Sequence, residues 1–171
     1  MIFVVATKNH YLEYGLSALL KREKVIIART FFIPDNRWHI LEYDEPYVII
    51  CDSNLARLMS CMFHGRKYFQ LDADYITGLK DIQNVKHRSV WEHAPNARAL
   101  TMSEMVVMFG YIYRQSRPCR LASEMGVNTK TVNTFLYTGM AKNGLQGKSV
   151  KSLVGRESAN NNRSIIRAGN I

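Results

Sequence analysis

The chain has 171 residues, 47% of them hydrophobic and 22% charged, which excludes a protein that is disordered throughout and predicts one or two small domains. Its formal net charge of +9 is unevenly divided, since residues 1–94 hold 12 Lys and Arg against 11 Asp and Glu, whereas residues 95–171 hold 11 against 3. This asymmetry favours a polyanionic partner for the second half, because basic side chains that neutralise phosphates release counterions. A solvated basic face without a partner is the alternative.

Patterns of catalytic and metal-binding residues do not occur in the sequence. The cysteines, Cys51, Cys61 and Cys119, have no C-x-x-C spacing and the histidines have no metal-ligand spacing, so we expect no disulfides, no metal site and no cofactor. No phosphate-binding loop, nucleophile elbow or convincing pair of carboxylates occurs, so we do not expect an enzyme. The first apolar run stops before Lys8 and predicts neither a signal peptide nor a membrane span.

The first half of the chain alternates predicted strands with predicted helices. Apolar runs predict strands over Ile2–Ala6, 25–28, Tyr47–Cys51 and 68–71, and apolar residues at helical spacing predict helices over 11–20, 54–64 and 75–85. Continuous apolar runs are typical of strands that are buried on both faces. The pattern therefore predicts a small parallel α/β sheet in a domain of residues 1–88.

A break in this periodicity precedes a helical second half. Residues 89–99 contain Pro95 and Asn96 and predict a linker. Residues 100–154 predict an all-α domain of four helices, the first of which begins at a capping box of Thr101 and Glu104. The remaining residues, 155–171, are polar and basic and predict a flexible tail.

The second and third of these helices have the punctuation of a helix-turn-helix. A short helix from Pro118 ends at Gly126, and a helix over 128–142 begins at Asn128, whose side chain can cap it. Helical spacing turns the apolar side chains of this last helix inward and leaves five residues outward, namely Thr129, Lys130, Asn133, Thr134 and Tyr137. Asparagine can bond adenine bidentately, the threonine methyl can contact thymine, and lysine suits phosphate. In a helix-turn-helix this part of the second helix enters the major groove.

This stretch resembles the LuxR-type (FixJ and NarL) DNA-binding domain of bacterial transcription regulators, over about a quarter of the chain. The matching positions are Leu100, Thr101, Glu104, Val107, Leu121, Ala122, Met125, Thr131, Val132, Lys142 and Gly144. The resemblance implies that Asn133, Thr134 and Tyr137 face bases and that Thr131 and Lys142 lie towards phosphates. We add Lys130 to the base contacts, and Thr129 and Lys148 to the phosphate contacts. The resemblance also implies that a fourth helix, over 146–154, mediates dimerisation.

The sequence departs from that family's pattern at three places. One additional residue lies between Val107 and Leu121, Phe135 replaces the common histidine after Thr131 and Val132, and Gly139 stands where an apolar residue is usual. Because glycine costs a helix about 1 kcal/mol relative to alanine, we expect the end of the helix 128–142 to be short or frayed.

The first half is similar to a response-regulator receiver domain, through the segments VVATKNHYLEYGLSALL and PYVIICDS. Asp52 follows the third predicted strand, where the phospho-acceptor of a receiver would lie. Receivers hold Mg²⁺ with an acidic pair after the first strand, and here Thr7 and Lys8 occupy those places. The first half is also shorter than a receiver by about one β-α unit, so the resemblance is to a degenerate, truncated receiver. Asp52 is then either a vestigial phospho-acceptor or a residue that caps the turn after its strand.

Together these features predict a cytoplasmic, nucleoid-associated transcription regulator that binds double-stranded DNA with the helix 128–142. We expect it to act as a homodimer, or as a heterodimer with a related regulator. We expect neither association with a membrane nor control by phosphorylation. One alternative is a response regulator that accepts phosphate on Asp52. The other is an adaptor whose helix-turn-helix binds protein and not DNA.

Overall fold

A computed structural model describes residues 1–87, 91–92 and 96–154 of the chain. The predicted tail of residues 155–171 lies outside these ranges, as does part of the predicted linker 89–99. In the described ranges, no helix is long and apolar enough to cross a membrane.

Four parallel strands form the sheet of the first half, in the order β2-β1-β3-β4. These are β1 (Ile2–Ala6), β2 (Lys24–Ile27), β3 (Tyr47–Cys51) and β4 (Tyr68–Asp72). In the middle of the sheet Val4 is in register with Ile26 on one side and with Ile49 on the other. The central strands β1 and β3 are apolar throughout because helices cover both faces of the sheet. The predicted small parallel sheet is confirmed.

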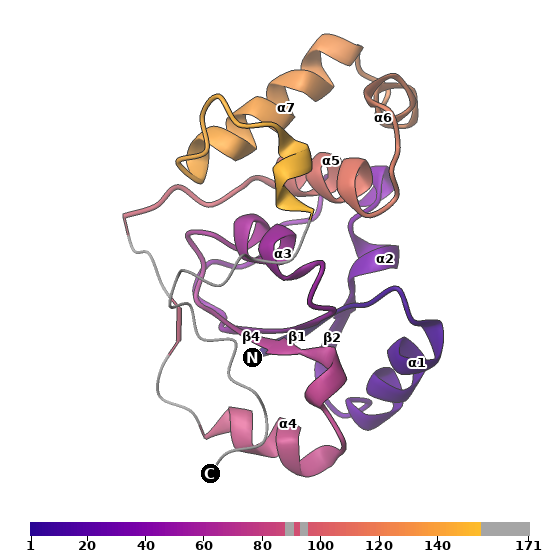
Figure 1. The fold of residues 1–171 in the computed structure, drawn as a ribbon, viewed down its shortest axis with the longest axis vertical. Coiled ribbons are helices and arrows are strands. Elements are labelled where there is room, and N and C mark those ends of the chain that lie inside the picture. The colour runs from indigo at the N-terminus through magenta and orange to yellow at the C-terminus, as the bar shows by residue number, and fades with distance from the viewer. Residues whose placement is uncertain (88–90, 93–95, 155–171) are drawn as a thin grey trace.

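Helices cover both faces of the sheet (Figure 1). On one face lie α1 (His10–Leu19) and α4 (Leu79–Lys86), which bury Leu16 and Ile82 in a cluster with Phe3 and Val5. The other face carries α2 (Ala28–Phe31) and α3 (Ala56–Met62). Two short 3₁₀ turns, η1 (Pro34–Asn36) and η2 (Ala73–Tyr75), complete this half.

The second half consists of three helices and a final 3₁₀ turn. These are α5 (Met102–Ile112), α6 (Pro118–Met125), α7 (Thr129–Lys142) and η3 (Val150–Leu153). The fourth helix that the sequence predicted over 146–154 is therefore a single short turn. Thr101 and Glu104 form the predicted capping box at the start of α5, where Glu104 Oε2 accepts a hydrogen bond from Thr101 N at 2.7 Å.

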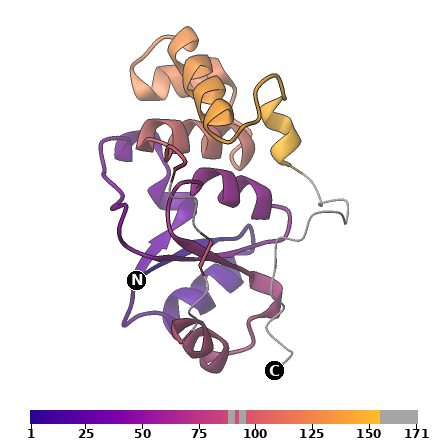
Figure 2. The same cartoon turned by 90° about the vertical axis from the view of Figure 1, so that its left-hand side faces the viewer.

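The two halves share one hydrophobic core. Helix α5 lies between α3, which covers the sheet, and the α6–α7 pair, as both views show (Figures 1 and 2). The Phe109 ring is 5.5 Å from the Phe32 ring of the first half, and it stacks on Tyr113 at 4.6 Å. One cluster of buried side chains continues from Val4 and Ile49 in the sheet to Val132 in α7. The predicted linker thus connects segments that pack around a common core.

Hydrogen bonds between the halves reinforce this packing. In each of them a side chain of one half donates to a backbone carbonyl of the other. The pairs are Arg37 to Met125, Arg57 to Ser152 at 3.0 Å, Arg66 to Leu100 at 3.1 Å, Asn143 to Cys61 at 3.1 Å and Tyr113 to Thr7 at 3.2 Å. Because these bonds are spread from Leu100, before α5, to Ser152 in η3, they fix the orientation of the helical half on the sheet.

We predict that Phe109→Ala unfolds both halves more readily. Truncation of this fully buried ring should lower the free energy of unfolding by about 3 to 5 kcal/mol. The ring of Trp91 packs against Phe69 of β4 with centroids 6.4 Å apart, whereas Trp38 is 77% exposed and changes little on unfolding, so the fluorescence change in a urea titration reports on the sheet and not on α5 itself. The fluorescence midpoint should fall together with the midpoint measured by circular dichroism, because a shared core unfolds in one transition.

The matched control is Tyr137→Ala, since that ring is 74% exposed and should leave both midpoints in place. A fluorescence midpoint unaffected by Phe109→Ala would mean that the halves unfold independently.

Candidate nucleic-acid interface

Helices α6 and α7 are joined by a three-residue turn. Gly126 ends α6 in the left-handed conformation, with φ of +65°, and the N–H of Val127 returns to the carbonyl of Ala122. Asn128 then begins α7, where its Oδ1 accepts hydrogen bonds from Thr131 N at 2.7 Å and from Thr131 Oγ1 at 2.9 Å. Nothing lies within 4 Å of the place where a Cβ of Gly126 would stand, so crowding does not require a glycine there. The positive φ does, because side chains disfavour that backbone conformation. This turn agrees with the sequence prediction.

One face of α7 is buried against α5. Val132, Leu136 and Met140 are buried. This agrees with the prediction that the apolar side chains of this helix turn inward. Gly139 is buried on the same face, and a Cβ there would lie only 2.7 Å from Met108 Sδ in α5. The expectation that Gly139 shortens or frays the helix is wrong, since α7 continues to Lys142. Helix α7 can pack closely across α5 only because residue 139 has no side chain. The free energy gained from this packing offsets the low helix propensity of glycine.

The opposite face of the first turns of α7 points to solvent. Thr129, Lys130, Thr134 and Tyr137 are exposed, while Thr131 and Asn133 are half-buried. Within the described ranges, neither the Asn133 amide nor the Lys130 ammonium has a side-chain hydrogen-bond or ion-pair partner. Thr134 Oγ1 donates to the Lys130 carbonyl at 2.9 Å, which leaves its methyl group and oxygen lone pairs available. The residues assigned to bases therefore share one helix face.

The surroundings of this face contain both free and paired basic groups. Arg117, before α6, and Lys148, after α7, are exposed, and in the described part of the chain neither forms an ion pair. Arg120 and Arg114 instead meet Glu124, at 2.9 and 3.6 Å. Free basic groups thus lie at both ends of the α6–α7 unit.

Lys142 is placed differently from the other residues assigned to phosphates. Its ammonium lies 2.8 Å from Glu104 Oε2 and 3.3 Å from the carbonyl oxygen of Ala99, and its side chain is only 17% exposed. Glu104 is more deeply buried, at 5%, and the same Oε2 caps the start of α5. Lys142 therefore balances a buried carboxylate and holds the end of α7 to α5, so we reassign it from phosphate binding to positioning.

Arg37 is a positioning residue that the sequence did not reveal. It follows η1 in the first half, yet its guanidinium donates a hydrogen bond to the carbonyl of Met125 at the end of α6. Its charge also lies 4.6 Å from the centre of the exposed Trp38 ring. A cation near the carboxyl end of a helix is favourable. No pattern in the sequence indicates this contact, because its acceptor is a backbone carbonyl far along the chain.

Asp52 lies at the carboxyl end of β3, beside Lys8. Asp52 Oδ2 accepts a hydrogen bond from Lys8 N at 2.8 Å, and the Lys8 ammonium is 5.8 Å from the centre of the Tyr113 ring. Among the described residues, no group of three or more His, Cys, Asp and Glu side chains could hold a metal ion. Thr7, the other residue at the position of a receiver's acidic pair, is buried.

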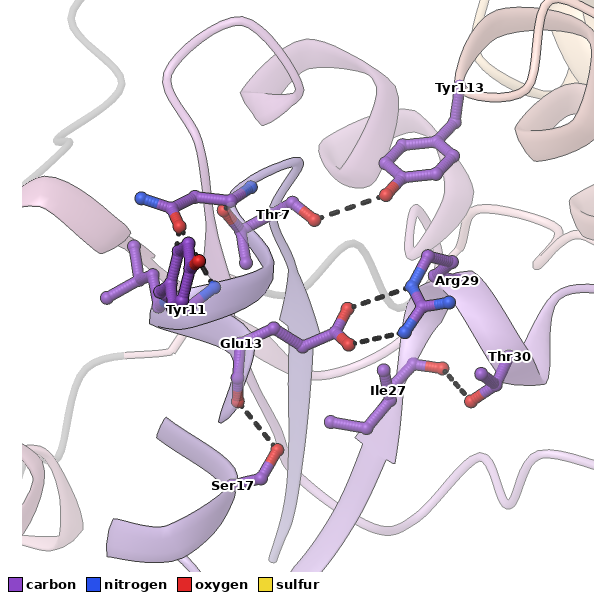
Figure 3. Close-up of polar contacts among 10 residues, drawn as sticks. Thr7, Tyr11, Glu13, Ser17, Ile27, Arg29, Thr30 and Tyr113 are labelled. Atoms are coloured by element: carbon purple, nitrogen blue, oxygen red, sulfur yellow. Dashed lines mark hydrogen bonds and ion pairs between the residues drawn. The ribbon is translucent and has the colours of Figure 1, made fainter. Parts of the chain in front are cut away.

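The helical half reaches this edge of the sheet through Tyr113, which follows α5 (Figure 3). Its hydroxyl donates to the Thr7 carbonyl at 3.2 Å. Burial raises the pKa of Tyr113, and the negative charge of Glu13 contributes in the same direction. Glu13 itself pairs with Arg29 at 2.7 Å, and this bond raises the pKa of the guanidinium. Internal contacts of α1, α2 and the end of α5 thus meet near the carboxyl edge of the sheet.

Comparison of the chain with protein-family models, with curated proteins and with solved structures finds no match.

We predict that Lys142→Met destabilises the fold. Removal of one partner leaves the Glu104 charge buried without a counter-ion and should lower the free energy of unfolding by about 3 kcal/mol in urea titrations. The double variant Glu104→Gln with Lys142→Met should recover most of that loss, because the glutamine carbonyl can still accept from Thr101 N.

A different pattern would restore the phosphate assignment. Lys142→Met would then leave stability unchanged and weaken DNA binding equally for all sequences, with a smaller salt dependence.

Proposed function

We propose that the protein is a sequence-specific DNA-binding transcription regulator that reads the major groove with the first turns of α7. The observation that carries this proposal is the exposed face of α7, on which Lys130, Asn133 and Tyr137 have chemistry suited to base edges and phosphates. In Figure 1 this helix, with α6, lies at the end of the molecule opposite α4, so a DNA duplex could approach it without meeting the sheet. A docking helix with this geometry is typical of helix-turn-helix proteins.

Charge supports the same proposal. The excess of 11 basic over 3 acidic residues belongs to residues 95–171, and two of those three acidic residues, Glu104 and Glu124, are paired with basic side chains. Exposed Lys130, Arg117 and Lys148 therefore face solvent, and none of them forms an ion pair with a described residue. Such a surface attracts a polyanion at long range and loses that attraction as salt increases.

The resemblance to LuxR-type regulators with a receiver-like first domain enters here as part of the proposal. The strand order β2-β1-β3-β4 is that of a receiver without its last strand. We propose that this half acts without phosphorylation, because the Lys8 backbone already occupies one Asp52 oxygen and no second acidic residue stands at the Thr7 and Lys8 positions.

Dimerisation, with a second copy or with a related regulator, stays part of the proposal, but not through a fourth helix. The segment 146–154 contains only η3, whose Leu153 is fully buried in the shared core. Arg57 of α3 also donates to the Ser152 carbonyl at 3.0 Å. This segment therefore belongs to the packing of its own chain, and a dimer would have to use another surface.

We predict separable effects for a base contact and a phosphate contact. Asn133→Ala should cost about 1 to 3 kcal/mol of binding free energy on the preferred DNA sequence and relax the preference at one base pair. Lys148→Ala should weaken preferred and random DNA alike and reduce the slope of log K against log salt by about one. Sequences selected from a random DNA pool, followed by anisotropy titrations at several salt concentrations, would measure both.

Lys80→Ala is the matched control for Lys148→Ala, because Lys80 is also exposed but lies on α4. Enrichment of no sequence from the pool, or equal losses on preferred and random DNA for Asn133→Ala, would overturn the assignment and favour a protein-binding adaptor.

A further inference from the structure

Helix α1 has a second apolar face that nothing in the described chain covers. Leu16 and Leu20, at the end of this helix, are buried against the sheet, yet Tyr11 and Tyr14 are 91% and 80% exposed. Tyr11, Tyr14 and Ala18 follow one another at helical spacing, so they lie on one side of α1. A surface helix normally keeps its outer face polar, and an apolar outer face indicates an interaction site.

This face continues into a cavity of about 540 Å³ between the end of α1 and α4. Ala18 and Leu19 line it from α1, and Leu79 and Ile82 line it from α4. Leu79 is half exposed, and no atom lies within 4 Å of the place where a Cβ of Gly15 would stand, which leaves room for close approach to α1. A ridge of tyrosines beside an apolar hollow fits the apolar side of a helix.

The charges around the cavity select the occupant. Of its four charged lining residues, Lys21, Arg22 and Lys86 are basic, and the acidic one, Glu23, is already paired with Lys86. In the described ranges Lys21 and Arg22 have no acidic partner. A second copy would bring the same basic rim to this face, and residues 155–171 of this chain carry three arginines against one glutamate. Both occupants would be repelled, whereas an acidic one would be attracted.

We propose that the outer face of α1 and the cavity beside α4 form a docking site for an acidic amphipathic helix of another protein. Its apolar side packs on Tyr11, Tyr14 and Leu79, and its carboxylates meet Lys21 and Arg22. The site lies at the opposite end of the molecule from α7 (Figures 1 and 2), so a bound helix leaves the DNA-reading face free. The inference depends on the surfaces of α1 and α4 alone and stands whether or not α7 binds DNA.

The test uses two labelled helical peptides of about 18 residues that share one leucine stripe and differ in flanking residues, glutamate in one and lysine in the other. Fluorescence anisotropy with the full chain at about 50 mM NaCl should show the glutamate peptide bound about tenfold more tightly than the lysine peptide. The difference should shrink at about 500 mM NaCl. Tyr14→Glu and Leu79→Glu should each weaken the glutamate peptide about tenfold.

Two further variants make the result specific. Ile40→Glu places the same charge on another exposed apolar side chain, 86% exposed and outside this site, and should leave the affinity unchanged. The double variant Lys21→Glu with Arg22→Glu should reverse the preference towards the lysine peptide. Equal affinity for both peptides, no binding of either, or an equal loss with Ile40→Glu would overturn the proposal.

Sedimentation equilibrium tests the competing occupant. A dimer of the wild-type chain that Tyr14→Glu converts to a monomer would show that the face pairs with a second copy, which would also overturn the proposal. DNA binding by the Tyr14→Glu variant, measured in parallel, should equal that of the wild type. If the wild-type chain binds DNA but not the glutamate peptide, only the docking proposal fails. If it binds the peptide but not DNA, only the proposed function fails.

Discussion

Helix α5 is buried on all its sides, and both halves of the chain pack around it. Every residue from Glu104 to Gly110 is buried, and a helix that is apolar all round is stable only when other elements surround it. Here α3 and Phe32 lie on one side and α6 and α7 on the other. Because both halves need the same helix for their cores, the helix-turn-helix cannot swing freely on the linker. Its orientation relative to the sheet follows from side-chain packing and not from the linker itself.

Two buried charges mark the junction of the halves and show what this arrangement costs. Glu104 is neutralised by Lys142, whereas Arg66 is 3% exposed and in the described ranges has no carboxylate partner. Its Nη2 donates to the Leu100 carbonyl, its charge lies 5.0 Å from the centre of the Tyr43 ring, and its Nε and Nη1 have no partner. Burial lowers the pKa of Arg66, although an arginine stays protonated. The apolar surroundings disfavour this charge, and its hydrogen bond to the Leu100 carbonyl fixes the chain just before α5 begins.

The two surfaces proposed for partners lie at opposite ends of this rigid body. The α7 face offers unpaired polar and basic groups, which suit a nucleic acid, and the α1 face offers exposed tyrosines and leucines within a basic rim, which suit a protein helix. Between them, at the carboxyl edge of the sheet, the Tyr113 hydroxyl donates to the Thr7 carbonyl and Asp52 accepts from the backbone of Lys8. Under the two proposals, DNA and a partner protein would bind to surfaces that do not overlap.

The helices, the strands and the turn between α6 and α7 can be predicted from the sequence, because they depend on residues close together in the chain. Strand runs, the Thr101–Glu104 capping box, Gly126 and Asn128 were all predictable from contacts within a few residues. The tertiary structure alone decided the roles of Lys142, Gly139 and Arg37, whose partners are Glu104, Met108 and the Met125 carbonyl. It also decided that 146–154 packs inward as a short turn, since that depends on Leu153 finding a place in the shared core. A local sequence pattern reflects hydrogen bonds between nearby residues and the burial of one face of an element. Which groups meet across α5 depends on how whole elements pack, and no spacing in the sequence encodes it.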